Sequence, residues 1–252
     1  MLNNQTAQAL REMRLSGMAD AYEHQLQNPH LVELSFEERF GMLVDAESTV
    51  RQNHRLSRLL QEAHLKVRAN PEDIDLHQAR GVDQGLLRDL TTCQWITAHH
   101  SLILTGPTGI GKTFIACALG TSACRMGLRV RYHRLSRLLQ DIFIAKADGS
   151  YPKLVKSFLK VDLLILDDWG LAAMSAPESR DLLDLVDDRF GTHSTCVISQ
   201  IPVEHWHQQF ADATVADAIL DRLVHNAYQL NLRGESMRKI TNSLPKSEGS
   251  GK

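Results

Sequence analysis

Residues 106–113 read Gly-Pro-Thr-Gly-Ile-Gly-Lys-Thr, and this stretch decides the fold. It follows the apolar segment 102–104 and precedes a helical pattern that begins at Phe114. A glycine loop between a strand and a helix is the context in which this spacing predicts a nucleotide site, because backbone N–H groups and the helix N-terminus face the phosphates. The alternative is a glycine-rich turn with a chance lysine. The expected nucleotide-binding residues are Gly106, Pro107, Thr108, Gly109, Ile110, Gly111, Lys112, Thr113 and Phe114.

Two residues of this loop have distinct chemical roles. Lys112 is expected to reach the β- and γ-phosphates, and Thr113 to offer its hydroxyl to Mg²⁺. The expected cofactors are therefore ATP and Mg²⁺.

Bulk composition sets wide bounds on the function. The chain has 252 residues, and 28 Lys and Arg nearly balance 30 Asp and Glu, so net charge neither favours nor excludes nucleic acid. We see no apolar run long enough to span a bilayer and no signal-peptide pattern. The four cysteines lack paired Cys-x-x-Cys spacing, which favours buried, reduced thiols. We expect a cytoplasmic protein without a membrane partner.

The chain divides into a helical first part and an alternating second part. Residues 1–68 carry helical spacing, and Ser35 with Glu38 forms a capping box that starts a long helix. Residues 69–81 predict a linker, because Asn-Pro, an acidic cluster and glycine are poor core material. An ATPase domain is expected over 82–240, and the polar tail 241–252 is expected to be disordered.

From residue 82 on, strand-like segments alternate with helical ones. This alternation predicts an α/β domain with a five-stranded parallel sheet covered by helices on both faces. The candidate strands are 101–105, 128–132, 161–167, 195–199 and 228–232, and the candidate helices are 112–125, 136–147, 175–190 and 214–226.

Two acids end the third candidate strand. Residues 163–166 are apolar, and Asp167 and Asp168 follow directly. Beside the glycine loop, Asp167 would hold Mg²⁺, largely through water, and Asp168 would polarise the water that attacks the γ-phosphate. The second acid favours hydrolysis over phosphoryl transfer to a bound substrate. The alternative is a buried strand that ends in solvated acids.

Three further polar residues complete the candidate site. Gln200, with Ser199 beside it, ends the fourth strand and is placed to sense the γ-phosphate and orient water. Arg222 lies on a helix, from which it could enter a neighbouring subunit's site as an arginine finger. The alternative is a surface ion pair with Asp221 or Asp217. Arg238 follows the last strand and could close over the phosphates.

The motifs as a set resemble the IstB-like ATPases, transposition helpers of bacterial insertion sequences and close relatives of the DnaC helicase loaders within the AAA+ superfamily. The resemblance extends to about residue 240. The loop and acid pair are generic to AAA+ proteins, whereas the N-terminal and C-terminal motifs are more specific. The matching segments are MRLSGMADAYEHQL, LSFEERFGMLVDAE, GVDQGLLRDL, GPTGIGKT, LLILDD, VISQIP, AILDRLVHNA and RGESMRK.

The resemblance implies a role for each matching position. Lys112, Thr113 and Asp167 match the phosphate and metal residues, and Gln200 matches the sensor. Arg222 matches the finger given to a neighbouring subunit, and Arg238 matches the arginine of the C-terminal signature. Asp168 stands where many relatives have glutamate, and Trp169 stands where a small residue is expected.

The resemblance also implies DNA as a partner, and two basic segments are candidates. One lies within 125–160 and the other on the long N-terminal helix. Phosphate contact would give salt-sensitive binding with little sequence preference. The alternative for either segment is a solvated surface. The residues assigned to DNA contact are Arg51, Arg55, Arg58, Arg131, Arg134, Arg137, Lys146, Lys153 and Lys156.

The function that the resemblance implies is an ATP-dependent assembly switch in transposition. Subunits would share ATP sites in a homo-oligomer, which grips and remodels duplex DNA and recruits and stimulates the transposase of the same element. One alternative is a DnaC-like replicative helicase loader. Another is a P-loop kinase for a small molecule, which leaves Arg222 and the N-terminal region unexplained.

Overall fold

The computed structural model describes residues 2–74, 81 and 83–234. It divides into two compact units, Met1–Arg58 and Leu59–Lys252. Helix α3 (Phe36–Ala63) runs from the first unit into the second, and each unit is described by itself. Within the described ranges, the longest helices are too short or too polar to cross a bilayer.

The first unit contains helices α1 (Leu2–Glu12) and α2 (Ser16–Gln27), the short 3₁₀ helix η1 (Pro29–Glu33) and the beginning of α3. The capping box expected at the start of α3 is confirmed. The Ser35 backbone N–H donates to Glu38 Oε2 at 2.8 Å, and the Glu38 N–H donates back to Ser35 Oγ at 3.3 Å. These bonds satisfy N–H groups that a helix start leaves without partners.

A buried glutamate joins α2 to α3. Glu47 Oε2 accepts hydrogen bonds from the backbone N–H groups of Gly17 at 2.9 Å and Met18 at 3.3 Å, in the first turn of α2. A Cβ atom on Gly17 would lie 2.8 Å from the Ala46 carbonyl oxygen. The two helices therefore approach too closely at this point for any residue but glycine.

The second unit is built on a five-stranded parallel sheet with the strand order β2-β3-β4-β1-β5. The α/β class and the parallel sheet predicted from the alternation are confirmed. Strand β4 lies between β1 and β3, so the strands that carry the glycine loop and the acid pair are not neighbours. The bounds are β1 (Ser101–Thr105), β2 (Val130–Arg134), β3 (Leu163–Trp169), β4 (Ser194–Ser199) and β5 (Ala227–Asn231).

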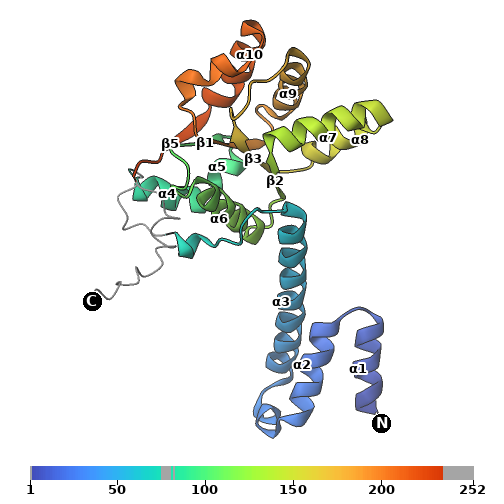
Figure 1. Cartoon of the computed structure of the whole chain (residues 1–252). Coiled ribbons are helices and arrows are strands. Elements are labelled where there is room, and N and C mark those ends of the chain that lie inside the picture. Colours follow the sequence, from blue (N-terminus) through green and yellow to red (C-terminus); the bar gives the residue numbers. More distant parts are fainter. Residues whose placement is uncertain (1, 75–80, 82, 235–252) are drawn as a thin grey trace, which may run out of the picture. The chain divides into compact units, whose positions relative to one another are not determined.

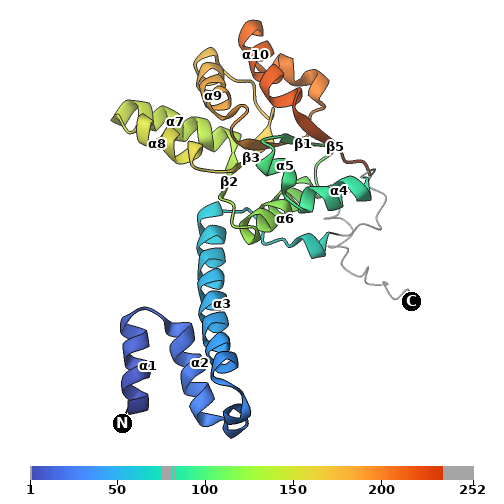
Figure 2. The ribbon, with the colours of Figure 1, turned by 180° about the vertical axis from the view of Figure 1, so that it is seen from behind.

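Helices cover both faces of this sheet. Figures 1 and 2 show α4, α5 and α6 on one face and α7 to α10 on the other. Leu166 and Val197 face the second group and join one large apolar core with α7, α9 and α10. The bounds are α4 (Gln84–Thr91), α5 (Gln94–Thr97), α6 (Lys112–Arg125), α7 (Leu135–Asp148), α8 (Tyr151–Leu159), α9 (Ala176–Arg189) and α10 (Ala213–Val224), with 3₁₀ helices η2 (Pro71–Asp73) and η3 (Val203–Gln209).

Two strands begin two residues later than the sequence predicted. Before β2, Gly127 adopts a positive φ of 81° and the Leu128 N–H bonds back to the Ala123 carbonyl, so this segment ends α6 instead of starting the strand. Before β3, the Val161 N–H bonds to the Phe158 carbonyl at the end of α8. Helix α8 itself was not predicted, although Pro152 stands in its first turn, where proline is favoured.

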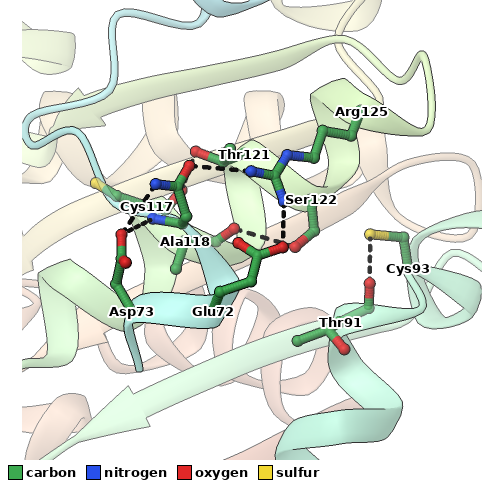
Figure 3. Close-up of polar contacts among 10 residues, drawn as sticks. Glu72, Asp73, Thr91, Cys93, Cys117, Ala118, Thr121, Ser122 and Arg125 are labelled. Atoms are coloured by element: carbon green, nitrogen blue, oxygen red, sulfur yellow. Dashed lines mark hydrogen bonds and ion pairs between the residues drawn. The ribbon is translucent and has the colours of Figure 1, made fainter. Parts of the chain in front are cut away.

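The C-terminal end of α6 is fixed to the segment that contains η2. The Arg125 guanidinium donates to Glu72 Oε1 at 2.6 Å and to Asn70 Oδ1 at 3.1 Å, and Figure 3 shows Arg125 and Glu72 facing each other across this contact. On the same side, the Cys93 thiol donates to the Thr91 carbonyl at 3.5 Å. All four cysteines are buried and free, as expected.

Candidate nucleotide-binding site

The carboxyl ends of β1, β4 and β3 bring three predicted groups to one edge of the sheet. The glycine loop follows β1, Gln200 follows β4, and Asp167 and Asp168 lie near the end of β3. Because β4 separates β1 from β3, Gln200 lies between the loop and the acids. This edge is where ligands bind in open parallel sheets.

The glycine loop needs glycine at defined positions. Gly106, Gly109 and Gly111 have φ values of +140°, +83° and +101°. At Gly106, an added Cβ would also lie 2.3 Å from the Leu232 carbonyl oxygen, in the segment after β5. The backbone of the loop is therefore held in a shape that side chains would prevent.

Gly106→Ala is expected to lower the free energy of unfolding by about 3 kcal/mol or more, because it adds a backbone clash to an unfavourable φ. Gly149→Ala is the matched control, since Gly149 has a φ of +78° with open space around its Cβ position. We expect that control to cost about 1 kcal/mol, the cost of the left-handed conformation alone. Urea unfolding measures both. Equal losses would show that the contact with Leu232 does not constrain the loop.

Lys112 is held inside the loop. Its Nζ donates to the carbonyl oxygens of Gly106 at 2.6 Å and Pro107 at 2.9 Å, and the residue is 7% exposed. Burial lowers the pKa of Lys112, and the nearby carboxylates of Asp167 and Asp168 oppose that shift. The Lys112 amine therefore lies beside the loop backbone, in the negative potential of the Asp167 and Asp168 carboxylates.

Asp167 is the most enclosed acid of the site. Its Oδ2 accepts hydrogen bonds from Tyr132 Oη at 2.6 Å, Thr113 Oγ1 at 2.9 Å and Lys66 Nζ at 3.2 Å, and its Oδ1 accepts the Asp168 N–H at 2.8 Å. Burial opposes ionisation, but these hydrogen bonds and the Lys66 charge bring the pKa of Asp167 below its usual value. Asp167 is thus an ionised carboxylate in a buried position.

The Thr113 and Asp167 oxygens fit a magnesium ion. Oxygen atoms from hydroxyls, carboxylates and water are the ligands that Mg²⁺ prefers. The Thr113 hydroxyl donates its proton to Asp167, so its lone pairs remain available to a cation. These two side chains would hold the ion, as the sequence predicted.

Asp168 is more open than Asp167. It adopts a left-handed φ of 62°, and its Oδ2 lies 3.5 Å from Arg134 Nε. The register between β3 and β4 shifts between Leu166 and Trp169, so the acid pair interrupts regular pairing. Because the backbone is irregular here, the two consecutive acids lie in different environments: Asp167 is buried and Asp168 is partly exposed.

Trp169, unexpected after an acid pair, packs below the site. It is fully buried, with ring centroids 5.1 Å from Trp206 and 6.2 Å from Phe210. The indole fills a space between β3 and the segment after β4, which a small residue would leave empty.

Gln200 contacts the glycine loop, and Ser199 does not. The Thr108 hydroxyl donates to Gln200 Oε1 at 2.5 Å. Ser199 is buried, donates its hydroxyl to the Trp169 carbonyl at 2.9 Å and accepts the Ile201 N–H at 3.0 Å. Of the two candidates at this strand end, Gln200 is the one that reaches the loop.

Arg222 lies near the amino ends of the strands, opposite the carboxyl ends that carry the glycine loop and the acids. It is near the end of α10 and lines a small cleft with Ser101, at the amino end of β1, and with Asn226, whose carbonyl accepts the Ser101 N–H. The loop follows the other end of β1, about 16 Å away for a five-residue strand. Arg222 therefore faces away from the site of its own chain.

The partner of Arg222 differs from the predicted alternatives. Its Nε donates to Asp187 Oδ1 on α9, and its Nη1 donates to the Ala218 carbonyl at 2.9 Å. The alternative named from the sequence was an ion pair with Asp221 or Asp217. That was wrong, because α9 packs against α10 and brings Asp187 to the arginine.

The other residues predicted to bind nucleotide include Ile110, Phe114 and Arg238. Ile110 is buried, and Phe114 is half-buried in the first turn of α6. Arg238 lies outside the described residues, as does the tail 241–252. The sequence prediction missed Lys66 and Tyr132, which contact Asp167 from 101 and 35 residues away along the chain. No motif spacing signals such pairs.

Several of the residues assigned to DNA contact form ion pairs or hydrogen bonds with other residues of this chain. Arg51 pairs with Glu47 at 2.7 Å, Arg131 donates to the Glu62 carbonyl at 3.3 Å, and Lys146 pairs with Asp181. Arg134 lies beside Asp168, as described above. Arg137 bonds Gln140 at 3.2 Å, and Arg55 and Arg58 lie on α3. Lys153 and Lys156 are exposed on α8.

Comparison with known proteins gives relatives over almost the full chain. The chain is 43% identical over 239 residues to y4pL of Sinorhizobium fredii, named as an insertion sequence ATP-binding protein, covering 95% of this chain and 98% of the relative. It is 46% identical over 203 residues to the ATP-binding protein of insertion sequence IS1162 from Pseudomonas fluorescens, covering 80% and 88%.

Solved structures share the fold. DnaI aligns with a TM-score of 0.56 at 19% identity, over 71% of this chain and 92% of that one. AMPPCP-bound DnaA from Aquifex aeolicus aligns with a TM-score of 0.58 at 17% identity, over 70% and 54%. About 70% of this chain therefore shares its fold with DnaI and DnaA.

A family model described as IstB-like ATP binding protein matches residues 8–245. This match covers nearly the whole chain and agrees with the insertion-sequence relatives. The chain thus belongs to the IstB-like ATP-binding proteins of insertion sequences.

Proposed function

We propose that this protein is an ATP-dependent, DNA-binding oligomeric ATPase that assembles on duplex DNA, remodels it, and recruits and stimulates the transposase of the same insertion sequence. The observation that carries the proposal is the separation of two groups. Lys112, Asp167 and Gln200 gather at one edge of the sheet, whereas Arg222 lies at the other. A site divided in this way is completed by a second copy of the chain.

ATP binding follows from the loop. Backbone N–H groups of residues 108–111 and the N-terminus of α6 offer donors and positive potential to the phosphates. Lys112 would exchange its bonds to the Gly106 and Pro107 carbonyls for phosphate oxygens. Thr113 and Asp167 would hold Mg²⁺, which supplies charge stabilisation to the phosphate oxygens when bound.

Hydrolysis needs a positioned water. The Gln200 amide contacts Thr108 in the glycine loop, and the Asp168 carboxylate is close enough to act on the charge of Lys112. We infer that Asp168 polarises the water and that Gln200 orients it toward the γ-phosphate. Arg222 of a neighbouring subunit would stabilise the charge that develops on the transferring group.

DNA contact is assigned to the strand β2 and the helices α7 and α8 that follow it. Within that region, Lys153 and Lys156 are the side chains best placed to meet phosphates, because both are exposed on one short helix. The arginines of α3 in the first unit form the second candidate surface. Phosphate contacts give affinity without sequence preference.

Lys153→Glu with Lys156→Glu is expected to weaken duplex binding and to flatten its salt dependence. Each lost phosphate contact lowers the slope of log K against log salt by about 0.9. Lys153→Arg with Lys156→Arg keeps the charge and should retain binding. Arg88→Glu on α4, on the other face of the sheet, is a charge-reversal control. Fluorescence anisotropy over a salt series measures this. An unchanged slope would remove α8 from the DNA surface.

A helicase loader is the alternative, since DnaI and DnaC share the fold. Those likenesses are below 20% identity, whereas the relatives above 40% identity are insertion-sequence proteins. Binding of single-stranded DNA in preference to duplex, together with capture of a replicative helicase and not of the transposase, would favour the loader.

A further inference from the structure

A lysine from outside the nucleotide motifs reaches the carboxylate of Asp167. Lys66 Nζ lies 3.2 Å from Asp167 Oδ2, and the two side chains are 28% and 3% exposed. The same oxygen accepts hydrogen bonds from Tyr132 and Thr113. Three donors therefore converge on one carboxylate oxygen, and one of them is a cation.

The segment that carries Lys66 is anchored independently of this ion pair. His64 adopts a positive φ of 50° directly after α3 ends at Ala63. Leu65 then packs on α6, where its Cδ2 lies 3.0 Å from the position that a Cβ on Gly120 would take. Arg131 on β2 donates to the Glu62 carbonyl. Lys66 is thus presented to Asp167 by a backbone that α6 and β2 hold in place.

We infer that Lys66 competes with Mg²⁺ for the Asp167 carboxylate: the lysine amine pairs with Asp167 until Mg²⁺–nucleotide binds and displaces it. The inference rests on the proposed function, because it assumes that Thr113 and Asp167 hold Mg²⁺. Two cations at one buried carboxylate repel each other more strongly than they would in water. The flexible stem of lysine allows its amine to leave while Leu65 remains packed.

Two consequences follow from this arrangement. Lys66 gives the buried Asp167 carboxylate a charged partner in addition to its neutral donors Tyr132 and Thr113. Displacement of its amine also links the nucleotide site to residues 64–68, the segment that directly continues α3. The position of the Lys66 side chain would therefore change when Mg²⁺–nucleotide binds, while Leu65 keeps its packing on α6.

The test is the Mg²⁺ concentration that half-saturates binding of a fluorescent ATP analogue to the full chain. Lys66→Met keeps most of the stem and removes the charge, and we expect this midpoint to fall about fivefold because the competing cation is gone. Lys66→Arg keeps a cation and should stay close to the wild type. Arg68→Met removes an exposed positive charge two residues along and should leave the midpoint unchanged.

Acetylation of the Lys66 amine, measured by peptide mass spectrometry, provides a second readout. In the wild type, Mg²⁺–nucleotide should speed acetylation of Lys66 relative to nucleotide with EDTA, whereas the exposed Lys153 should react equally in both. A midpoint that is unchanged or higher in Lys66→Met, or acetylation of Lys66 that does not respond to Mg²⁺ in the wild type, would overturn the inference. Absence of Mg²⁺-dependent nucleotide binding in the wild type would instead refute the proposed function itself.

Discussion

Lys112→Ala is expected to weaken ATP binding by about 10- to 100-fold, the value of one charge-assisted hydrogen bond to a charged group, and to abolish ATP-dependent complexes on DNA. Lys112 is the buried cation of the loop, and its amine is placed between the Gly106 and Pro107 carbonyls and the acid pair. Without Lys112, the loop backbone alone would attract the phosphates, and the carboxylates of Asp167 and Asp168 would repel them.

Isothermal titration with Mg²⁺–ATP measures the binding loss, and an electrophoretic shift with duplex DNA measures the complexes. Arg88→Ala removes an exposed cation of α4, outside both candidate DNA segments, and is the control. Circular dichroism checks that Lys112→Ala folds, since the loop loses two hydrogen bonds. A folded Lys112→Ala protein that still assembles on DNA in response to ATP would contradict the assignment of the nucleotide site.

Arg222→Ala is expected to keep nucleotide binding and to lower ATP hydrolysis by a factor on the order of 1000, the scale at which an arginine finger acts. The physical reason is the position of Arg222 at the amino end of β1, away from the site of its own chain. Steady-state phosphate release on DNA measures the effect. Asp187→Asn removes the same ion pair while leaving the arginine, so it separates loss of the finger from loss of a surface contact.

A mixing experiment makes the prediction sharper. Lys112→Ala protein retains Arg222, and Arg222→Ala protein retains the glycine loop, so a mixed assembly contains some complete joints between neighbouring subunits. We expect the mixture to recover part of the hydrolysis that each variant lacks alone. Normal turnover by Arg222→Ala alone, or no recovery in the mixture, would refute a shared site.

The parts of this fold that the sequence predicted well are those determined by local patterns. Helix α6 begins at Lys112 and ends at Arg125, as the sequence predicted, because the glycine loop and Gly127 mark its two ends. The helix predicted from residue 175 likewise begins there, because Ser175 and Glu178 form a capping box at the start of α9. Strand β1 has an apolar centre at residues 102–104 and is buried at every position, and its predicted limits were also correct.

The parts that were missed depend on tertiary contacts. Tyr132 and Lys66 contact Asp167 only because β2 pairs with β3 and because residues 64–68 pack against α6. Asp187 binds Arg222 only because α9 lies against α10. Periodicity describes one element at a time, so pairs of polar residues from separate elements remain invisible to it.

The basic residues also show what sequence patterns leave out, namely which cations have partners within the protein. A count of charge over 125–160 treats every lysine and arginine alike, yet Lys146 is paired with Asp181 and lies 4.9 Å from the Tyr151 ring centroid. Arg134 lies beside Asp168 in the nucleotide site. The structure therefore separates exposed cations from those that have partners within the protein, which composition cannot do.

Electron microscopy of the purified protein with a duplex of about 50 base pairs, on which an oligomer of several subunits can assemble and bend the DNA, tests the central claim most directly. The protein and duplex are imaged in ATP and, separately, in ADP. We predict ordered oligomers on DNA in ATP, with the Arg222 edge of one subunit against the glycine loop of the next, and few or none in ADP. Isolated subunits on the DNA in both nucleotides, or the same oligomers in ADP as in ATP, would contradict the account.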